Sequence, residues 1–176
     1  GRAVDNAAIL GTGVGNMPKG IRYMTGVHNL TLAGPTWAQV TDFAATIESD
    51  DADIGTMGWA MTPKAKKVFR TTLKVTGDAG GGFLMEGGTL DGYQVATTTS
   101  LPNTDAESPP ANDSTVVFGA WQQLLIGLWS GIDMLPNAFA ESAYDRGRVL
   151  VRAMQDVDCA VRHVQSFAFA NDLSVG

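Results

Sequence analysis

The sequence has very little of the residue types that build several common kinds of site. Its 176 residues include one cysteine and two histidines, which excludes an intramolecular disulfide and a cysteine-based zinc site. No apolar run approaches the roughly 18 residues that a membrane-spanning helix needs. The first residues also lack the basic-then-apolar order of a secretion signal. We therefore expect neither a membrane span nor secretion.

Basic residues are also in the minority. Twelve lysines and arginines stand against eighteen aspartates and glutamates, which gives a formal net charge of −6. Binding to nucleic-acid phosphates needs clustered lysines and arginines, so this balance argues against a sequence-specific nucleic-acid partner. An apolar content of 44% with 17% charged residues is typical of a globular chain. The length predicts one substantial domain, or one domain with a projecting piece.

The most informative stretch is residues 148–163, where apolar and charged side chains alternate. One set of alternate positions is almost wholly apolar: Val149, Val151, Ala153, Gln155, Val157, Cys159 and Val161. The charged residues all belong to the other set: Arg148, Arg152, Asp156, Asp158 and Arg162. This alternation predicts a single strand that is buried on one face. A helix is excluded, because Arg152, Gln155 and Asp156 would interrupt any apolar stripe at the helical period.

Such a strand would be unusually long. At about 3.3 Å per residue it would span roughly 50 Å, whereas an ordinary strand spans about 17–20 Å. We expect it to reach beyond the compact body, with residues 165–170 returning as its antiparallel neighbour. Its apolar face should pack on the chain's own core, with Cys159 as a buried structural thiol. The charged face is the predicted contact with other subunits, formed by Arg148, Arg152, Asp156, Asp158 and Arg162.

A glycine-rich segment near the N-terminus raises the possibility of nucleotide binding. Gly11, Gly13 and Gly15 resemble the start of a dinucleotide fingerprint, but the position of its third glycine holds Asn16. Lys19 is followed by glycine rather than by the serine or threonine of a phosphate loop. We therefore favour an irregular turn with left-handed glycines. A small nucleotide- or ligand-binding enzyme domain that uses the Gly11–Gly15 turn is the alternative function.

Two helices are predicted from their caps and apolar faces. In residues 36–49, Thr36 and Gln39 fit a capping box. The inward face of this helix is Trp37, Val40, Phe43, Ala44 and Ile47. In residues 64–73, Thr62-Pro63 supplies the N-cap and the first helical position, and the inward face is Ala65, Val68, Phe69 and Leu73. The remaining cations of this second helix, Lys64, Lys66, Lys67 and Arg70, are expected to form a solvated face rather than a phosphate site.

Acidic residues gather directly after the first helix, at Glu48, Asp50, Asp51 and Asp53. The calcium-loop pattern with its central glycine and terminal glutamate is missing, so we expect an exposed acidic turn. Strands are predicted at residues 57–61, 93–98, 115–118 and 124–129. The intervening segments 77–92, 101–114 and 130–147 are expected to be irregular.

No constellation of residues requires catalysis. His28 and His163 do not have the spacing of metal ligands, and no Gly-x-Ser-x-Gly elbow occurs. Both histidines are therefore interpreted as surface or structural residues. We expect no enzyme activity, no catalytic residue, no cofactor and no metal.

Several segments together are similar to the major capsid proteins of tailed bacteriophages. The similar segments, in order, are residues 8–21, 61–64, 90–95, 117–121 and 148–169. Herpesvirus capsid floors and encapsulin nanocompartments use the same fold. The order and spacing of the five segments in this chain resemble the C-terminal part of the phage capsid family, and the segments extend over nearly the whole chain.

The resemblance implies an α+β fold, the phage major-capsid fold, with residues 25–145 as an axial domain around five-fold and six-fold positions. Residues 1–24 and 146–176 would form part of a peripheral domain with a long antiparallel β-hairpin. In the family, an N-terminal arm, an extended loop and a spine helix come before the glycine segment, which only residues 1–6 precede here. The chain would thus be a C-terminal portion that lacks these parts.

The resemblance also implies a function. The protein would be a structural subunit of an icosahedral bacteriophage or prophage head that assembles into pentamers and hexamers. It would occur in the virion and assemble in the cytoplasm of the bacterial host. Its main partner would be itself, with scaffold, protease, portal and decoration proteins as further candidates. An encapsulin-like cargo shell subunit is the alternative within the same fold.

Overall fold

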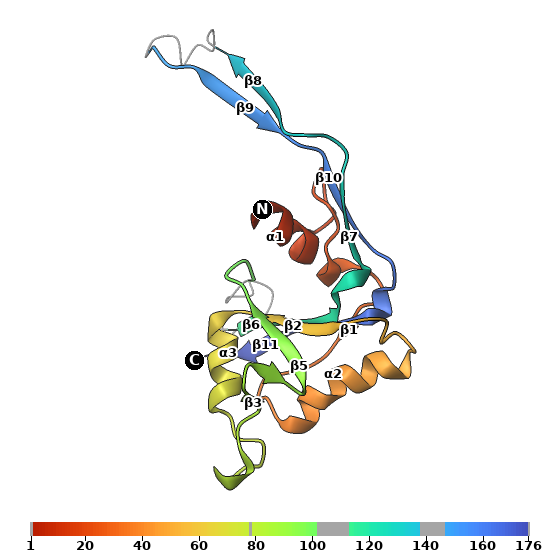
Figure 1. Cartoon of the computed structure of the whole chain (residues 1–176), viewed down its shortest axis with the longest axis vertical. Coiled ribbons are helices and arrows are strands. Elements are labelled where there is room, and N and C mark those ends of the chain that lie inside the picture. The colour runs from red at the N-terminus through yellow and green to blue at the C-terminus, as the bar shows by residue number, and fades with distance from the viewer. Residues whose placement is uncertain (1, 78, 102–112, 138–146, 176) are drawn as a thin grey trace.

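The computed structural model describes residues 2–77, 79–101, 113–137 and 147–175. It has a mixed α+β body from which one long ribbon projects (Figure 1). The helices are α1 (Arg2–Leu10), α2 (Trp37–Ser49) and α3 (Pro63–Thr71). Short 3₁₀ turns occur at Ile21–Tyr23, Ala79–Gly81, Trp121–Gln123 and Val164–Ser166.

The body is organised around a seven-stranded sheet with the order β1-β11-β6-β2-β5-β4-β3. Its strands are β1 (His28–Asn29), β2 (Met57–Met61), β3 (Met85–Glu86), β4 (Thr89–Leu90), β5 (Tyr93–Thr97), β6 (Asp113–Ala120) and β11 (Phe167–Ser174). The pairs β1–β11 and β2–β5 are parallel. The β11–β6, β6–β2, β5–β4 and β4–β3 pairs are antiparallel. The sheet therefore joins segments from both ends of the sequence.

Helices α2 and α3 cover one face of this sheet. Phe43 of α2 and Phe69 of α3 pack in one buried cluster with Trp59 and Phe118, which lie on the central strands. Ala60 and Val117, their neighbours in sequence, belong to a second cluster on the opposite face, together with Phe167. Alternate residues of the central strands thus face two separate cores, because side chains alternate along a strand.

The caps of both covering helices form as predicted. Thr36 Oγ1 accepts a hydrogen bond from Gln39 N at 3.3 Å, and Gln39 Oε1 accepts one from Thr36 N at 3.0 Å, which completes the capping box. Thr62 Oγ1 accepts from Ala65 N at 3.1 Å and lies 2.6 Å from the hydroxyl of Ser114 on β6. This buried pair of hydroxyls fixes the start of α3 against the sheet.

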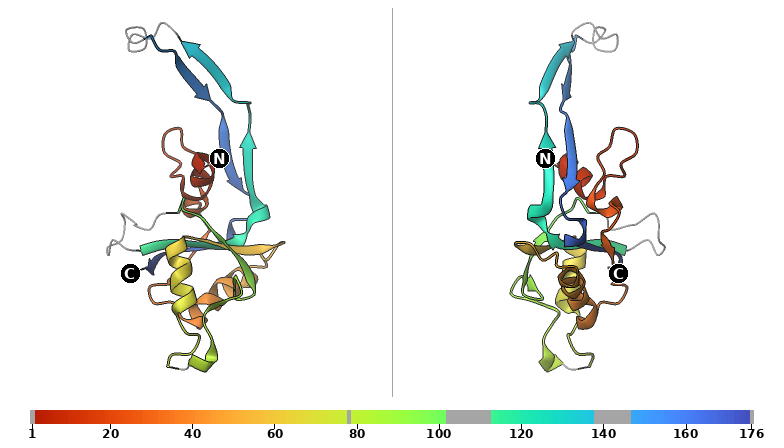
Figure 2. Two further views of the ribbon diagram at one scale, coloured as in Figure 1. Left: turned by 60° about the vertical axis from the view of Figure 1, so that its left-hand side comes forward. Right: turned by 90° about the vertical axis from the view of Figure 1, so that its right-hand side faces the viewer.

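The projecting ribbon, here called the arm, consists of two consecutive antiparallel pairs (Figures 1 and 2). Its inner half pairs β7 (Leu124–Leu128) with β10 (Val157–Val161). Its outer half pairs β8 (Asp133–Asn137) with β9 (Leu150–Met154). Between the halves, residues 129–132 of one strand face only residues 155–156 of the other. Such an unequal count bends a ribbon.

The arm corrects the prediction of one continuous strand over residues 148–163. That segment forms two strands with a break at Gln155 and Asp156, where Asp156 N donates to Ser130 Oγ at 3.3 Å. Its antiparallel neighbour is 124–137 rather than 165–170. Residues 167–170 instead pair with β6 in the middle of the large sheet. Their unbroken run of apolar side chains suits a strand that is buried on both faces.

Strand pairing assigns segments to the body and to the arm, whereas the predicted division into residues 1–24 with 146–176 and residues 25–145 stays a prediction. Residues 124–137 lie with 150–161 in the arm, and 167–174 lie in the body. Three predicted loops need correction as well. Residues 77–92 contain the β3–β4 hairpin, residues 130–147 contain β8, and Asp113 and Ser114 begin buried strand β6. Within the predicted loop 101–114, residues 102–112 lie outside the described residues.

The N-terminal helix α1 was not predicted. It leads into the glycine turn, where Gly13 and Gly15 have φ values of 72° and 67°, as expected for left-handed glycines. A Cβ atom on Gly11 would lie 2.1 Å from the carbonyl oxygen of Pro18, so this position requires glycine. The turn closes when Gly20 N donates to Gly11 O at 2.8 Å. It connects α1, which lies beside the arm, to the body.

Candidate interaction surfaces

The inner half of the arm has the predicted alternation. Val157, Cys159 and Val161 lie on one face, opposite Leu128, Ile126 and Leu124 across the ladder. Cys159 is 6% exposed, whereas its neighbours Asp158 and Ala160 are exposed. Helix α1 packs beside β10. Burial, and to a lesser extent the Asp158 carboxylate, raises the pKa of the Cys159 thiol. The burial of Cys159 that the alternation predicted is confirmed, and a thiol in such surroundings is less readily ionised.

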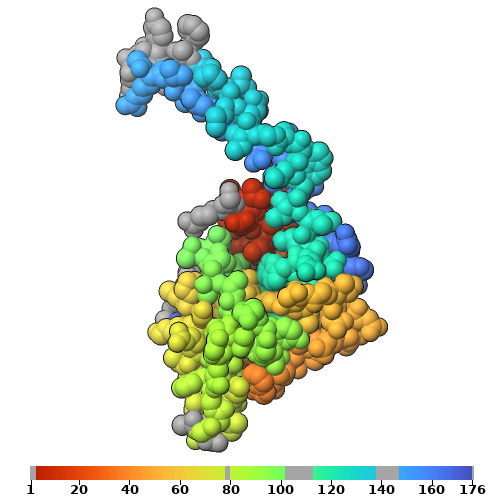
Figure 3. Space-filling model, in the orientation of Figure 1, coloured from red at the N-terminus to blue at the C-terminus, as the bar shows by residue number. Residues whose placement is uncertain are grey.

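The outer half of the arm is exposed on both faces. In the β8–β9 ladder, Met134 lies opposite Ala153 and Pro136 lies opposite Val151. Paired residues of an antiparallel ladder share a face, so these four side chains form one wholly apolar face. Figure 3 shows that this half stands clear of the body. No element within the described ranges covers it.

The apolar residues of the outer arm were predicted to pack on the chain's own core, and this is wrong. Val149 is 59% exposed and Val151 is 58% exposed. The alternation indicated correctly that these residues share one kind of face, but it could not show what covers that face. A long two-stranded ribbon reaches beyond the core that one small chain can build.

The five charged residues of the predicted contact are all exposed: Arg148, Arg152, Asp156, Asp158 and Arg162. They are spread along the arm and are not gathered at one place. Arg152 lies on β9 opposite Leu135, and Asp158 lies on β10, where its Oδ1 accepts from Cys159 N at 2.8 Å. None of the five forms an ion pair with another described residue. Their role in contacts with other subunits stays a prediction.

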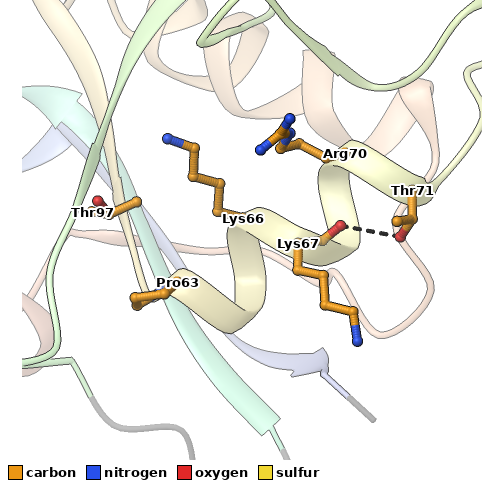
Figure 4. Close-up of a pocket in the computed structure, with 6 residues that line it drawn as sticks. All are labelled: Pro63, Lys66, Lys67, Arg70, Thr71 and Thr97. Atoms are coloured by element: carbon orange, nitrogen blue, oxygen red, sulfur yellow. Dashed lines mark hydrogen bonds between the residues drawn. The ribbon is translucent and has the colours of Figure 1, made fainter.

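A basic face lies on α3. Because Ala65 and Phe69 point into the core, the cations Lys64, Lys66, Lys67 and Arg70 lie on the outside of the helix. A groove of about 390 Å³ lies beside them. Its lining residues, drawn in Figure 4, are Pro63, Lys66, Lys67, Arg70, Thr71 and Thr97. Lys66 and Arg70 also border a second groove of about 310 Å³ next to Met85, Gly87 and Gly88. The solvated face predicted from the sequence is thus flanked by two hollows.

The acidic turn lies at the far end of β2 from this basic face. Glu48, Asp50, Asp51 and Asp53 are exposed, as predicted. Among the described residues, no group of His, Cys, Asp and Glu side chains is arranged to hold a metal ion. His28 Nε2 lies 3.1 Å from Asp50 Oδ2, although the pair lacks hydrogen-bond geometry. The interpretation of His28 as a surface or structural residue stays a prediction.

Asp91 adds a further carboxylate near the acidic turn. Burial raises its pKa, the nearby Glu48 carboxylate raises it further, and Lys74 lowers it. Asp91 and Gly92 have φ values of 51° and 77° in the two-residue turn between β4 and β5, the geometry that favours Asp-Gly in hairpins. The local negative charge is therefore high enough for one carboxylate to affect the titration of another.

The sequence profile of the phage capsid family matches residues 1–172. The chain belongs to the phage capsid family. The major capsid protein of Halomonas phage phiHAP-1 is 27% identical over 167 residues, which are 94% of this chain and 25% of that protein. This capsid-family chain therefore spans about a quarter of the length of that relative.

Solved structures of the same architecture agree with the family. The capsid of an empty GTA particle superposes with a TM-score of 0.63 at 17% identity. The match covers 98% of this chain and 62% of the GTA capsid chain. The holo-SrpI encapsulin complex from Synechococcus elongatus PCC 7942 has a TM-score of 0.57 at 10% identity, with coverage of 99% and 61%. At these identities the likeness establishes the fold, which is the capsid fold expected from the sequence. Within the described part of this capsid-family chain, no helix is long and apolar enough to span a membrane.

Proposed function

We propose that this chain is part of the structural subunit of a bacteriophage or prophage head, and that it associates with other copies of itself into pentamers and hexamers. The observation that carries the proposal is the exposed apolar surface of the arm. Its exposed large apolar residues are Leu125, Ile126, Leu128, Trp129, Ile132, Met134, Leu135, Val149, Leu150, Val151 and Met154. Large exposed apolar surfaces on proteins mark interaction sites.

The construction of the arm supports the same proposal. An isolated two-stranded ribbon is only marginally stable in water, and the outer arm has no cover from the described part of its own chain. Contacts with neighbouring copies would provide both the apolar burial and the missing support. We assign the seven-stranded body with α2 and α3 to the axial domain, and α1 with the arm to the peripheral domain. The role is structural and needs no catalytic group, cofactor or metal.

The location and further partners follow from this role. The assembled protein would occur in the virion, after assembly in the host cytoplasm, and its surfaces would be available to scaffold, protease, portal or decoration proteins. An encapsulin-like shell is the second candidate, because the fold is shared with an encapsulin. The contents of purified shells separate the two: nucleic acid indicates a phage head, and a packaged protein indicates a cargo shell.

Sedimentation velocity of the full-length product of the gene tests the proposal. We expect a concentration-dependent shift from single subunits to rings and closed particles without any added ligand. A protein that stays monomeric at every concentration and ionic strength would argue against a shell subunit.

The glycine turn provides the test of the ligand-binding alternative. Gly11–Gly15 do not open a helix, so no helix N-terminus is directed at a phosphate. Calorimetric titration with ATP and with NAD at millimolar concentration should show no heat of binding. A dissociation constant below about 100 μM would favour the ligand-binding domain instead.

A further inference from the structure

The body carries two surfaces of opposite charge at opposite ends of one strand. The acidic turn ends shortly before β2 begins at Met57, and α3 begins at Pro63, directly after β2 ends. Because β2 is extended, the two surfaces are separated by its length of about 17 Å. Figure 1 shows the end of α2 and helix α3 on opposite flanks of the body. The two charge clusters of one copy therefore cannot neutralise each other.

From this arrangement we infer that the basic face of α3 binds the acidic turn of a neighbouring copy of the same chain, in a head-to-tail contact. The inference rests on the proposed self-association and deepens it by naming the two complementary surfaces. A contact between different patches on two identical chains is heterologous, and it closes into a ring when the rotation between copies allows it. Each copy then uses its acidic turn on one side and α3 on the other.

The charges of the two surfaces match and are available. Lys64, Lys66, Lys67 and Arg70 form no ion pair with any other described residue. On the acidic side, Asp50 lies beside His28, whereas Glu48, Asp51 and Asp53 form no ion pair with another described residue. The raised pKa of Asp91, to which the Glu48 carboxylate contributes, reports the same local excess of negative charge.

The shapes of the two surfaces also suit each other. The acidic turn is exposed and has Ile54, 43% exposed, directly after Asp53. The basic cations border two hollows beside α3 rather than a flat surface. A turn with carboxylates around an apolar side chain fits such grooves, because charged rims around an apolar contact are the usual composition of protein interfaces.

A packaged nucleic acid is the competing occupant of the basic face. Three features favour a second copy: the net charge of −6, the absence of an aromatic side chain among the residues that line either groove, and the acidic surface on the same body. A second copy supplies that acidic surface as a partner of opposite charge for the basic face.

A charge-swap experiment in the full-length protein tests the contact. One double variant is Lys67→Glu with Arg70→Glu, and the other is Glu48→Lys with Asp53→Lys; all four positions are exposed. Each double variant is expected to lower the assembled fraction at least about tenfold at low salt, an equilibrium change equivalent to about 1.4 kcal/mol. The variant that combines all four substitutions restores the opposite charges across the contact. It is expected to assemble within about twofold of the unmodified protein.

Controls separate the possible outcomes. Lys19→Glu makes the same kind of charge reversal at an exposed site away from both surfaces and should assemble normally. Thermal melting of each variant shows whether its subunit still folds. Normal assembly of the basic-face variant would overturn the inference, and so would failure of the folded combined variant to recover. Normal shells that contain less nucleic acid would assign α3 to nucleic acid instead. If the unmodified protein itself never assembles, the proposed function fails and the inference fails with it.

Discussion

Phe43 links α2 to the centre of the sheet. It is completely buried, and its ring centroid lies 5.1 Å from that of Trp59. Trp59 in turn lies 4.4 Å from Phe118 and donates its Nε1 hydrogen to Leu90 O at 3.1 Å. This row of rings connects helix α2 with strands β2 and β6, and the Trp59 hydrogen bond adds strand β4. Removing one ring leaves a cavity that the neighbouring aromatic side chains cannot fill.

We therefore expect Phe43→Ala to lower the free energy of unfolding by about 3–5 kcal/mol. The adjacent Asp42 is exposed on the other side of α2, so Asp42→Ala should be close to neutral. Chemical denaturation of both variants measures the difference. Equal and small losses at the two positions would show that the buried face of α2 has been assigned wrongly.

Asp91 provides a test that depends on pH. Its pKa is raised in the folded state, chiefly by burial and then by Glu48. The protonated form is therefore favoured by folding, and stability decreases as pH rises from the ordinary aspartate pKa through the raised one. At neutral pH the ionised carboxylate is a net cost, although a small one, because the group is largely solvated.

Asp91→Asn removes this cost and keeps a residue that tolerates a positive φ. We expect the melting temperature at pH 7 to rise by about 1–2 °C. The gain should shrink as pH falls through the range where the aspartate becomes protonated. Differential scanning calorimetry across this range is the measurement, with Asp42→Asn as the exposed control. A gain that does not depend on pH would mean that the turn conformation, rather than the charge, is responsible.

The features of single residues could largely be predicted from the sequence. The caps at Thr36 and Thr62, the inward faces of both helices and the left-handed Gly13 and Gly15 all depend on neighbours within a few positions. Helix α1 was missed, although Val4 and Ala8 have helical spacing.

At the scale of elements, the arm shows how far an alternating pattern can be interpreted. The pattern over 148–163 predicted correctly that Cys159 is buried and Asp158 exposed. It could not indicate the break at residues 155–156, because that break depends on the extra residues 129–132 of the partner strand. The predicted partner strand, residues 165–170, was also wrong. Strand pairing over a long sequence separation depends on the competition among all apolar segments of the chain.

Arg152 lies on the outer arm, opposite Leu135, and is exposed to solvent. A single exposed charge contributes only about 0–1 kcal/mol to the fold of one subunit. We expect Arg152→Glu in the full-length protein to change the melting temperature by no more than a few degrees and yet to impair assembly. The defect should be larger at low salt, where the like-charge repulsion that it introduces is least screened.

Light scattering at several ionic strengths, combined with thermal melting, measures both effects. Lys19→Glu again serves as the matched control, because it makes the same charge change on an exposed residue of the glycine turn, outside the arm. Unfolding of the Arg152 variant, or normal assembly at every ionic strength, would show that this face of the arm is not a contact between subunits.

At the scale of the whole molecule, the body and the arm differ in how they are stabilised. The body has two buried clusters, one on each face of its sheet, which supply its apolar burial. The outer arm has no such cluster among the described residues. We propose that neighbouring copies bury its apolar face, since repetition of one contact around a closed shell would multiply a small free energy many times.

The topology of the body could not be predicted from local patterns. The β6–β11 pair joins segments about fifty positions apart in the sequence, for example Phe118 with Ala168. Neither strand carries a local signal for the other. The resemblance to capsid proteins indicated the fold class and the projecting hairpin, whereas the strand order depends on contacts that only the structure shows.

Burial of the arm's apolar face by another copy of the same protein is what we propose for this chain. Electron cryomicroscopy of particles formed by the full-length product tests it most directly. The account predicts closed shells in which Met134, Pro136, Val151 and Ala153 of every copy are covered by a neighbouring subunit. Shells in which this face remains exposed to solvent, or a full-length product that forms no particles, would contradict it.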